Sequence, residues 1–293
     1  MPLAGVVAVI RSPLFINRVK RLVGFTAGLV LLYAPLALIA RAFALAAPGS
    51  LAGTTVSDVH TACLRMPWGW LIQPWMLSTL QGNPVYWVAI LLLPATAIIL
   101  GPLFCGWVCP AGAVSEYLGR IVPDRSKFDL KRLVDIVPLR YGFFGGLLLA
   151  PFVSASICCS FCNFTHMQNI VSAVFGDSSG FAFLSSTGVI AATLWIVPLG
   201  VLTVGGRGWC LFLCPAGTVM GIASAVTARF PWARRMRTRD TCAACGECER
   251  VCPMRAVKLD APGPAEIDHR LCIDCLDCAA ACKTGAMRYG KPS

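Results

Sequence analysis

The sequence is poor in charge, and poorest in acidic residues. Only 13% of its 293 residues are charged, with 14 Asp and Glu against 25 Lys and Arg, while 57% are hydrophobic. A soluble domain usually has roughly 25% charged residues. The balance therefore argues against an ordinary soluble enzyme and predicts a membrane protein with a modest polar appendage. The net charge of +11 does not indicate a nucleic-acid binder, because no nucleic-acid motif accompanies it.

Other signatures are missing as well. No Cys-x-x-Cys-His haem attachment motif is present. No kinase, cyclase or DNA-binding segment is attached, which argues against a redox sensor acting through this chain alone. The apolar runs lack the internal acidic or basic residues that mark ion paths, which argues against a transporter.

Four apolar runs are close to the roughly 20 residues that a helix needs to cross a membrane. They cover residues 23–40, 85–105, 141–158 and 187–204. Basic residues flank the first run, the loop between the second and third, and the segment after the fourth, whereas the other two loops are nearly uncharged. By the positive-inside rule this pattern predicts a four-helix transmembrane bundle in a bacterial inner membrane, multi-pass, with both termini cytoplasmic.

A tryptophan-rich segment, residues 66–80, lies in the first charge-poor loop. It carries Trp68, Trp70 and Trp75, and indole rings prefer the membrane interface. The functional alternative is part of a quinone pocket. His60, Gln73 and Glu116 are polar residues near the same boundaries, but they do not define a quinone site.

Eight cysteines in the tail form two matched runs. The first is Cys242, Cys245, Cys248 and Cys252, and the second is Cys272, Cys275, Cys278 and Cys282. This is the spacing of a bacterial two-cluster ferredoxin, in which the fourth cysteine of each run ligates the other cluster. The spacing predicts one 4Fe-4S cluster on Cys242, Cys245, Cys248 and Cys282, and a second on Cys272, Cys275, Cys278 and Cys252. Zinc sites also use Cys-x-x-Cys pairs, but they do not need eight cysteines in two such runs.

A second cysteine pattern is an internal repeat. Cys-x-x-x-Cys-Pro-Ala-Gly occurs at Cys105 and Cys109 and again at Cys210 and Cys214. Cysteines four apart share a helix face, and the following proline marks a helix end or the start of the next element. The two copies suggest a duplicated helix hairpin that gathers four thiols. These thiols would ligate a further metal, form a redox-active dithiol, dock the tail, or pack as small apolar groups.

Taken together, these motifs resemble the NapH and MauN ferredoxin-type proteins, and the helical part is similar to the membrane part of NosR-like proteins. The resemblance covers residues 23–283. It implies electron transfer from the quinone pool or a cytoplasmic donor to a periplasmic redox system. That system is nitrate reduction in NapH-like proteins and methylamine dehydrogenase function or maturation in MauN-like proteins. The matching positions are the eight tail cysteines with Cys105, Cys109, Cys210 and Cys214.

The two outer loops depart from the NapH-like pattern. They carry Cys63, Cys158, Cys159, Cys162, His60 and His166. In an oxidising compartment the simpler expectation is one or two disulfides, and a metal site is the alternative.

We therefore expect an α-helical membrane domain over residues 1–224, a basic linker over 225–239 and a small α+β two-cluster ferredoxin domain over 240–293. The expected function is a relay of single electrons through two 4Fe-4S clusters, as a carrier rather than a stand-alone enzyme, with quinol oxidation left open. Expected partners are membrane lipid, the quinone pool or a donor protein, and a periplasmic redox partner, with no nucleic acid. The alternative is a maturation factor that supplies electrons for the assembly of a periplasmic enzyme.

Overall fold

A computed structural model describes the fold over residues 12–33, 36–46, 77–82, 84–153, 162–176, 187–259 and 263–292, with Leu71 and Pro74. Helices dominate from the start to residue 227. They are α2 (Pro13–Leu32), α3 (Leu38–Ala46), α5 (Leu77–Gly82), α6 (Pro84–Leu100), α7 (Pro110–Gly119), α8 (Leu130–Leu133), α9 (Ile136–Val153), α11 (Asn163–Val174), α13 (Thr187–Ile196), α14 (Gly208–Phe212) and α15 (Pro215–Thr227). Short π-helical turns, η3 (Phe104–Val108) and η5 (Val197–Val201), and a 3-10 turn, η4 (Asp124–Ser126), join them.

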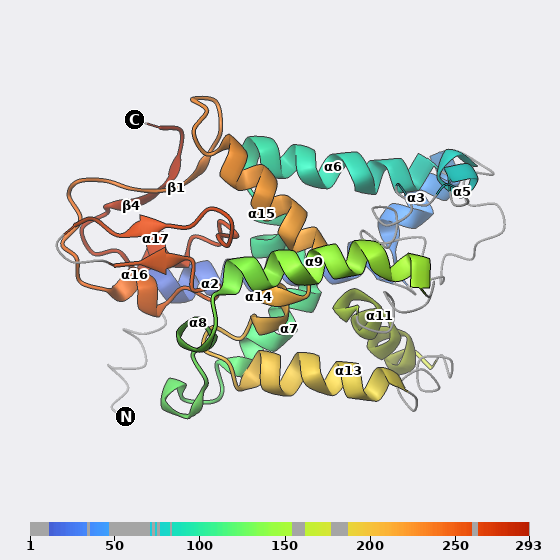
Figure 1. The fold of residues 1–293 in the computed structure, drawn as a ribbon, viewed down its shortest axis with the longest axis horizontal. Helices are drawn as coiled ribbons and strands as arrows, with labels where there is room; N and C mark the ends of the chain where they lie inside the picture. Colours follow the sequence, from blue (N-terminus) through green and yellow to red (C-terminus); the bar gives the residue numbers. More distant parts are fainter. Residues whose placement is uncertain are drawn as a thin grey trace.

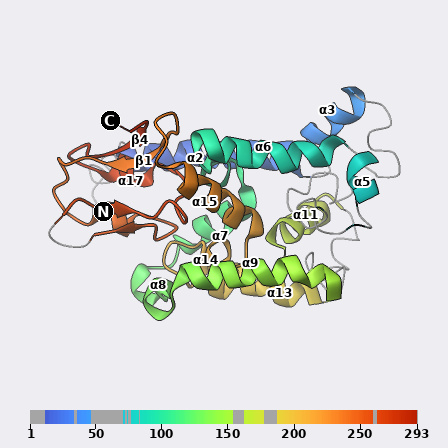
Figure 2. The same cartoon turned by 45° about the horizontal axis from the view of Figure 1, so that its top comes forward.

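The long helices run side by side, and the tail domain covers one end of them (Figure 1). Helices α3, α5 and α11 lie at the opposite end in both views (Figure 2). Helix α15 packs along α6, and α2 packs along η3. The tail domain is therefore positioned against the ends of the helices rather than along their sides.

Local sequence explains where the key helices begin. Ser12 caps α2 by accepting a hydrogen bond from the Phe15 N–H at 3.2 Å, and Pro13 occupies the first helical turn. Pro110 and Pro215 begin α7 and α15, with Cys109 and Cys214 as the preceding caps. In both copies of the repeat, then, the proline after the second cysteine starts the next helix.

The prediction of a four-helix transmembrane bundle is wrong. In the part of the chain that the structure describes, no helix is both long enough and apolar enough to span a membrane. Helix α6 stops at Leu100 because Gly101 takes a left-handed conformation (φ +81°) and Pro102 follows, and α13 gives way to a π-helical turn at Val197. A hydropathy average does not detect such breaks, because the residues on both sides of them are apolar. The multi-pass inner-membrane location rested on those four spans and is corrected by the same finding.

The tail domain is a small α+β unit. Strand β1 (Arg235–Thr238) pairs antiparallel with β4 (Met287–Gly290), and β2 (Val257–Lys258) pairs antiparallel with β3 (Glu266–Ile267). The short helices α16 (Glu247–Arg250) and α17 (Asp277–Ala281) each lie within one cysteine run, between its second and fourth cysteines. Strand β1 lies within the segment expected to be a linker, so residues 235–238 contribute a strand to this unit.

Candidate metal centres

The two tail cysteine runs share one backbone conformation. Positive φ angles occur two residues after the first cysteine at Ala244 and Asp274, and four residues after it at Gly246 and Leu276. A third matched pair, Arg255 and Gly285, follows the fourth cysteine of each run. A non-glycine residue with positive φ is uncommon. Its recurrence at equivalent places indicates that both loops turn their N–H groups toward the thiols, as in the anion-binding nests of iron-sulfur sites.

Four tail thiols lie together in a buried group. Burial, aided by the nearby Cys252 thiol and opposed by Arg21, raises the pKa of Cys275 to about 12. Burial likewise raises the pKa of Cys272 and of Cys278 well above the usual range. Cys278 and Cys252 add to the effect on Cys272, and Cys275, Cys252 and Cys248 add to the effect on Cys278. These four thiols are the ones expected to hold the second cluster.

The other tail thiols show two kinds of environment. Burial raises the pKa of Cys248, and the neighbouring Cys242 and Cys245 add to that effect. The pKa of Cys282 is lowered: its slight burial acts upward, but hydrogen bonds from the Thr284 hydroxyl and from backbone N–H groups outweigh it. Cys248 belongs to an apolar cluster of the tail domain, and Cys242 and Cys282 pack against that cluster. Cys245 is exposed. The environment of Cys282 is suited to a thiolate.

The repeat places four more thiols near one another. They are Cys105, Cys109, Cys210 and Cys214, and we call them the four-thiol centre. Burial raises the pKa of Cys105 well above its usual range, and the thiols of Cys109, Cys214 and Cys210 raise it further. The structure therefore brings both copies of the repeat to one place.

Two of the outer-loop residues, Cys162 and His166, lie in the described part of the chain. Cys162 and His166 lie one turn apart at the start of α11, and both are buried. The His166 ring stacks on Trp195 with centroids 6.3 Å apart. His60, Cys63, Cys158 and Cys159 lie outside the described residues, as does most of the tryptophan-rich segment.

An ion-pair junction that the sequence did not predict joins the helices to the tail. It consists of Arg18, Arg21, Glu116, Arg120, Arg207 and Asp277. Arg21 donates to Glu116 at 2.8 and 2.9 Å and to Asp277 at 3.0 Å. Arg207 Nε donates to Glu116 at 2.6 Å. Glu116 had been noted only as a polar residue near a boundary, although an acidic residue in so apolar a stretch is itself a signal.

The junction also contacts both cysteine systems through the backbone. Arg21 Nε donates to the carbonyl of Gly106 at 2.9 Å, and Arg207 Nη1 donates to that of Cys105 at 2.8 Å. Asn17 donates to the carbonyl of Cys275 at 3.1 Å. Burial alone would raise the pKa of Glu116, but the guanidinium groups of the junction outweigh it and lower that pKa to about 2. The carboxylate therefore stays ionised at any ordinary pH.

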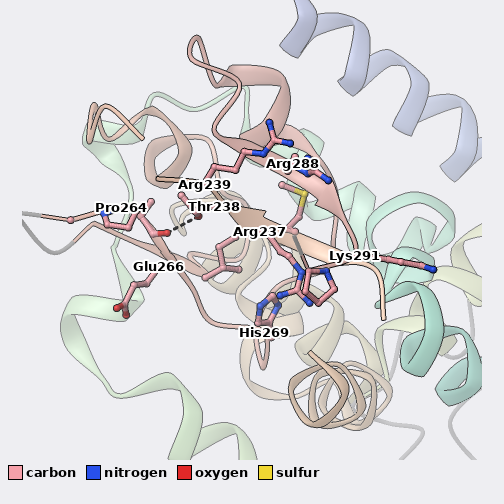
Figure 3. A pocket seen from close by; sticks show the side chains of 13 residues that line it. Arg237, Thr238, Arg239, Pro264, Glu266, His269, Arg288 and Lys291 are labelled. Atoms are coloured by element: carbon pink, nitrogen blue, oxygen red, sulfur yellow. Dashed lines mark hydrogen bonds between the residues drawn. The ribbon is translucent and has the colours of Figure 1, made fainter. Parts of the chain in front are cut away.

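A basic pocket of about 560 Å³ opens on the tail domain (Figure 3). Cationic side chains surround it: Arg237, Arg239, Arg288 and Lys291. Glu266 is the acidic residue among its lining side chains, and His269 lies on the same side as Arg237. Met236, in the pocket wall, belongs to the apolar cluster that contains Cys248 and Cys278. The pocket is thus an anion-attracting surface backed by the tail cysteines.

Within the described ranges, no three His, Cys, Asp or Glu side chains are arranged to hold a single metal ion. That finding covers the tail cysteines and the four-thiol centre alike. It describes ligands that converge on one point. A 4Fe-4S cube instead takes one thiolate at each of four iron corners, so its ligands stand farther apart.

Family models match both cysteine systems. A 4Fe-4S binding domain matches residues 83–129 and 187–235, one copy of the repeat in each, and a 4Fe-4S dicluster domain matches residues 241–286. An uncharacterised protein of Methanocaldococcus jannaschii is 25% identical over 75% of this chain and 84% of its own length.

Two relatives have informative names. The ferredoxin-type protein NapH of Haemophilus influenzae is 28% identical over 66% of this chain and 63% of its own length. The methylamine utilization ferredoxin-type protein MauN of Methylorubrum extorquens is 33% identical over 55% of this chain and 53% of its own length. The chain is thus similar to the NapH and MauN ferredoxin-type proteins. It spans less than two thirds of the length of either named relative.

The dicluster-domain match and the ferredoxin-type relatives support 4Fe-4S clusters as the cofactor. No solved structure matches the chain. The family resemblance inferred from the cysteine motifs is confirmed.

Proposed function

We propose that this ferredoxin-type protein relays single electrons between redox partner proteins through two 4Fe-4S clusters in its tail domain. The observation that carries the proposal is the matched backbone conformation of the two cysteine runs. Eight cysteines in this spacing fit two clusters. Bound there, such clusters supply reversible one-electron chemistry without a change in bonding.

The ligands of each cluster follow from the two-cluster ferredoxin rule. Cys242, Cys245, Cys248 and Cys282 would hold the first cluster. Cys252, Cys272, Cys275 and Cys278 would hold the second. The mutual proximity of the last four thiols supports that grouping. The hydrogen bonds that favour the Cys282 thiolate support its role as a ligand.

The basic pocket supports an acidic redox protein as one partner. Four cationic side chains line the pocket against a single carboxylate, so a protein with an acidic face would be attracted and oriented there. The pocket wall is the reverse side of the apolar cluster around Cys248 and Cys278. A partner seated in the pocket would stand close to the tail clusters.

Metal analysis of the full chain, purified without oxygen, tests the relay. We expect iron and acid-labile sulfide in equal amounts, and coupled EPR signals of two clusters after reduction with dithionite. In a Cys275→Ser variant, one cluster's signal should be lost or altered while the other remains. Zinc in place of iron would overturn the proposal.

The docking step has its own test. A reduced acidic flavodoxin should transfer electrons to the protein at a rate that falls steeply with salt. The double change Arg288→Glu and Lys291→Glu should slow that transfer at least tenfold at low salt. The matched control is Arg132→Glu, since Arg132 is exposed on α8 away from the pocket. If Arg132→Glu slowed electron transfer as much as the double change, the pocket would not be the docking site.

A further inference from the structure

The basic pocket of the tail domain is large enough to hold a small molecule. Its volume of about 560 Å³ falls within the range of roughly 300–1,000 Å³ that ligand pockets usually have. Residues of β1, of β4 and of the segment 263–269 line it (Figure 3). None of the described residues that line it is phenylalanine, tyrosine or tryptophan. A ligand would therefore be held by charge and hydrogen bonds rather than by stacking on such rings.

Two arginines stand directly opposite each other on the strands that form one wall of the pocket. Arg237 of β1 is paired with Arg288 of β4. Their strand neighbours Met236 and Met287 pack in the apolar cluster of the tail domain, so the alternation of side chains turns both guanidinium groups to the pocket side. Like charges directly opposite each other destabilise an antiparallel pair. An anion between the two arginines would replace that repulsion with attraction.

No carboxylate neutralises the cations of the pocket in the part of the chain that the structure describes. The ion pairs found there include none of the four cationic lining residues, Arg237, Arg239, Arg288 and Lys291. Glu266 is the acidic residue of the lining, and its side chain points away from Arg288 and Lys291 (Figure 3). The pocket therefore keeps an excess of positive charge.

Two buried nitrogen atoms of the lining residues have no hydrogen-bond partner among the described residues. They are Arg237 Nε and His269 Nδ1. Arg237 Nη2 donates to the carbonyl of Ala228 at 2.6 Å, which holds the guanidinium in place. Burial, with Arg237 and Arg235 nearby, lowers the pKa of His269 to about 4, so its ring is neutral at neutral pH and can carry its proton on Nδ1. Buried N–H groups without partners are unfavourable and rare, and these two indicate an acceptor that the chain does not itself supply.

Phosphate groups suit this arrangement better than carboxylates do. The planar fork of an arginine binds two phosphate oxygens at once, and a phosphate has enough oxygens to bridge two guanidinium groups. A carboxylate carries a single negative charge, whereas four cations line the pocket against one carboxylate. A pyrophosphate group carries several negative charges on linked phosphates and would balance that excess.

We propose that the basic pocket binds a pyrophosphate group, free or carried by a nucleotide, with Arg237 and Arg288 on either side of it and His269 as a further donor. Binding is non-covalent, and no bond forms or breaks. The same pocket is the proposed docking site of an acidic redox protein, so a bound pyrophosphate group would exclude that partner. This regulatory consequence rests on the proposed function, whereas the binding site itself does not.

Isothermal titration calorimetry with inorganic pyrophosphate at constant ionic strength tests the site on the full chain, purified without oxygen. Wild-type protein should bind one pyrophosphate per chain. Arg288→Gln should weaken the binding at least tenfold, because it removes one of the two opposed forks. Arg288→Lys keeps the charge without the fork and should fall between the two. Arg132→Gln, on α8 outside the pocket, is the matched control and should bind as the wild type does.

Two further ligands distinguish the sources of the group. ADP that binds more tightly than pyrophosphate would identify a nucleotide as the ligand, and ADP that binds more weakly would identify free pyrophosphate. Sulfate at the same ionic strength should bind at least tenfold more weakly than pyrophosphate. Equal binding of sulfate would show a general anion-attracting surface and overturn the proposal. It would also be overturned if neither pyrophosphate nor ADP bound, or if wild type and Arg288→Gln bound them equally.

Thermal unfolding covers the case in which Arg288→Gln folds poorly. Without ligand, this variant should unfold at the same temperature as the wild type or higher, because the change removes a like-charge pair. Saturating pyrophosphate should raise the unfolding temperature of the wild type and not that of the variant. A lower unfolding temperature of the free variant would show that the chain itself stabilises the arginine pair and would overturn the proposal.

The binding experiments involve no electron transfer, so the two proposals for the pocket fail separately. If pyrophosphate does not bind while transfer from flavodoxin still falls steeply with salt, the ligand site is wrong and the docking step stands. If pyrophosphate binds while that transfer does not depend on salt, the docking step is wrong and the ligand site stands.

Discussion

The two copies of the repeat share the pattern Cys-x-x-x-Cys-Pro-Ala-Gly and differ in the buried arginine that each contacts. Seven residues after its second cysteine, the first copy has Glu116, which binds Arg207 directly. The equivalent residue of the second copy is Gly221, and the missing side chain admits the backbone of Arg270, which accepts from Arg140. Arg207 forms an ion pair with a carboxylate, whereas Arg140 donates hydrogen bonds to neutral oxygens.

The difference indicates that the copies have separate tasks. The first copy fastens the helices to α17 through Glu116, Arg21 and Asp277. The second leaves Arg140 with hydrogen bonds to two neutral oxygens, the Thr218 hydroxyl and the Arg270 carbonyl. The duplicated motif thus supplies matched thiols, while the residue seven positions after the second cysteine decides whether the nearby arginine is paired with a carboxylate.

Removing the carboxylate of the first copy should have the largest effect on stability. Glu116→Gln leaves Arg21 and Arg207 buried beside a neutral amide, which we expect to cost about 3–5 kcal/mol of unfolding free energy. Thermal unfolding of the anaerobic protein measures it. The matched control is Glu247→Gln, whose partner Arg250 is exposed, and it should change stability by less than about 1 kcal/mol. Equal effects would contradict a special role for the first copy.

Filling the space left by the second copy should be the next largest change. A Cβ on Gly221 would lie 2.2 Å from the carbonyl oxygen of Arg270, so Gly221→Ala must push that loop away from Arg140. We expect a loss of about 1–3 kcal/mol, as for other overpacked positions. Gly145→Ala on α9 is the control, since nothing lies within 4 Å of its Cβ position. If Gly221→Ala is as stable as the control, the close approach is unimportant.

Acid should weaken the contact between Arg140 and the Arg270 carbonyl, which follows His269, before it affects the ion pair of Glu116 with Arg207. Burial, with Arg237 and Arg235 nearby, lowers the pKa of His269 to about 4, and Asp268 opposes this only in part. Below about pH 6.5 His269 binds a proton in the unfolded chain but not in the folded chain. The free energy of unfolding therefore decreases as pH falls from 6.5 toward 4. At pH 5 the loss should be about 1–2 kcal/mol relative to pH 7.5. In His269→Gln this part of the pH dependence should vanish, whereas an unchanged profile would assign it elsewhere.

The hydroxyl that holds Arg140 should have the smallest effect of the four. Thr218→Val removes the acceptor of Arg140 Nε and should cost about 1–2 kcal/mol, because a buried charged donor loses its partner. Thr218→Ser keeps the hydroxyl and should cost less. Thermal unfolding of the two variants side by side makes the comparison, and equal losses would show that the methyl group, not the hydroxyl, matters.

Sequence predicted the cysteine systems well because ligand spacing is local. The tail spacing led to the 4Fe-4S family, and the repeat led to four thiols that the structure does bring together. The transmembrane bundle was wrong because hydropathy averages over Gly101, Pro102 and the π-helical turn at Val197. The ion-pair junction was missed because Arg21, Glu116 and Asp277 are far apart in the sequence, and no local pattern reveals such pairs.

The bond between Arg21 and Asp277 also sets an order of events in time. The two residues are separated by 256 positions, so during synthesis the first helix exists long before its last partner. Until α17 emerges, Arg21 has no access to Asp277, and the ferredoxin end must close onto helices already made. Contacts of such long separation form slowly. The ion pair that joins the first helix to the tail domain is therefore among the last contacts that the growing chain can make.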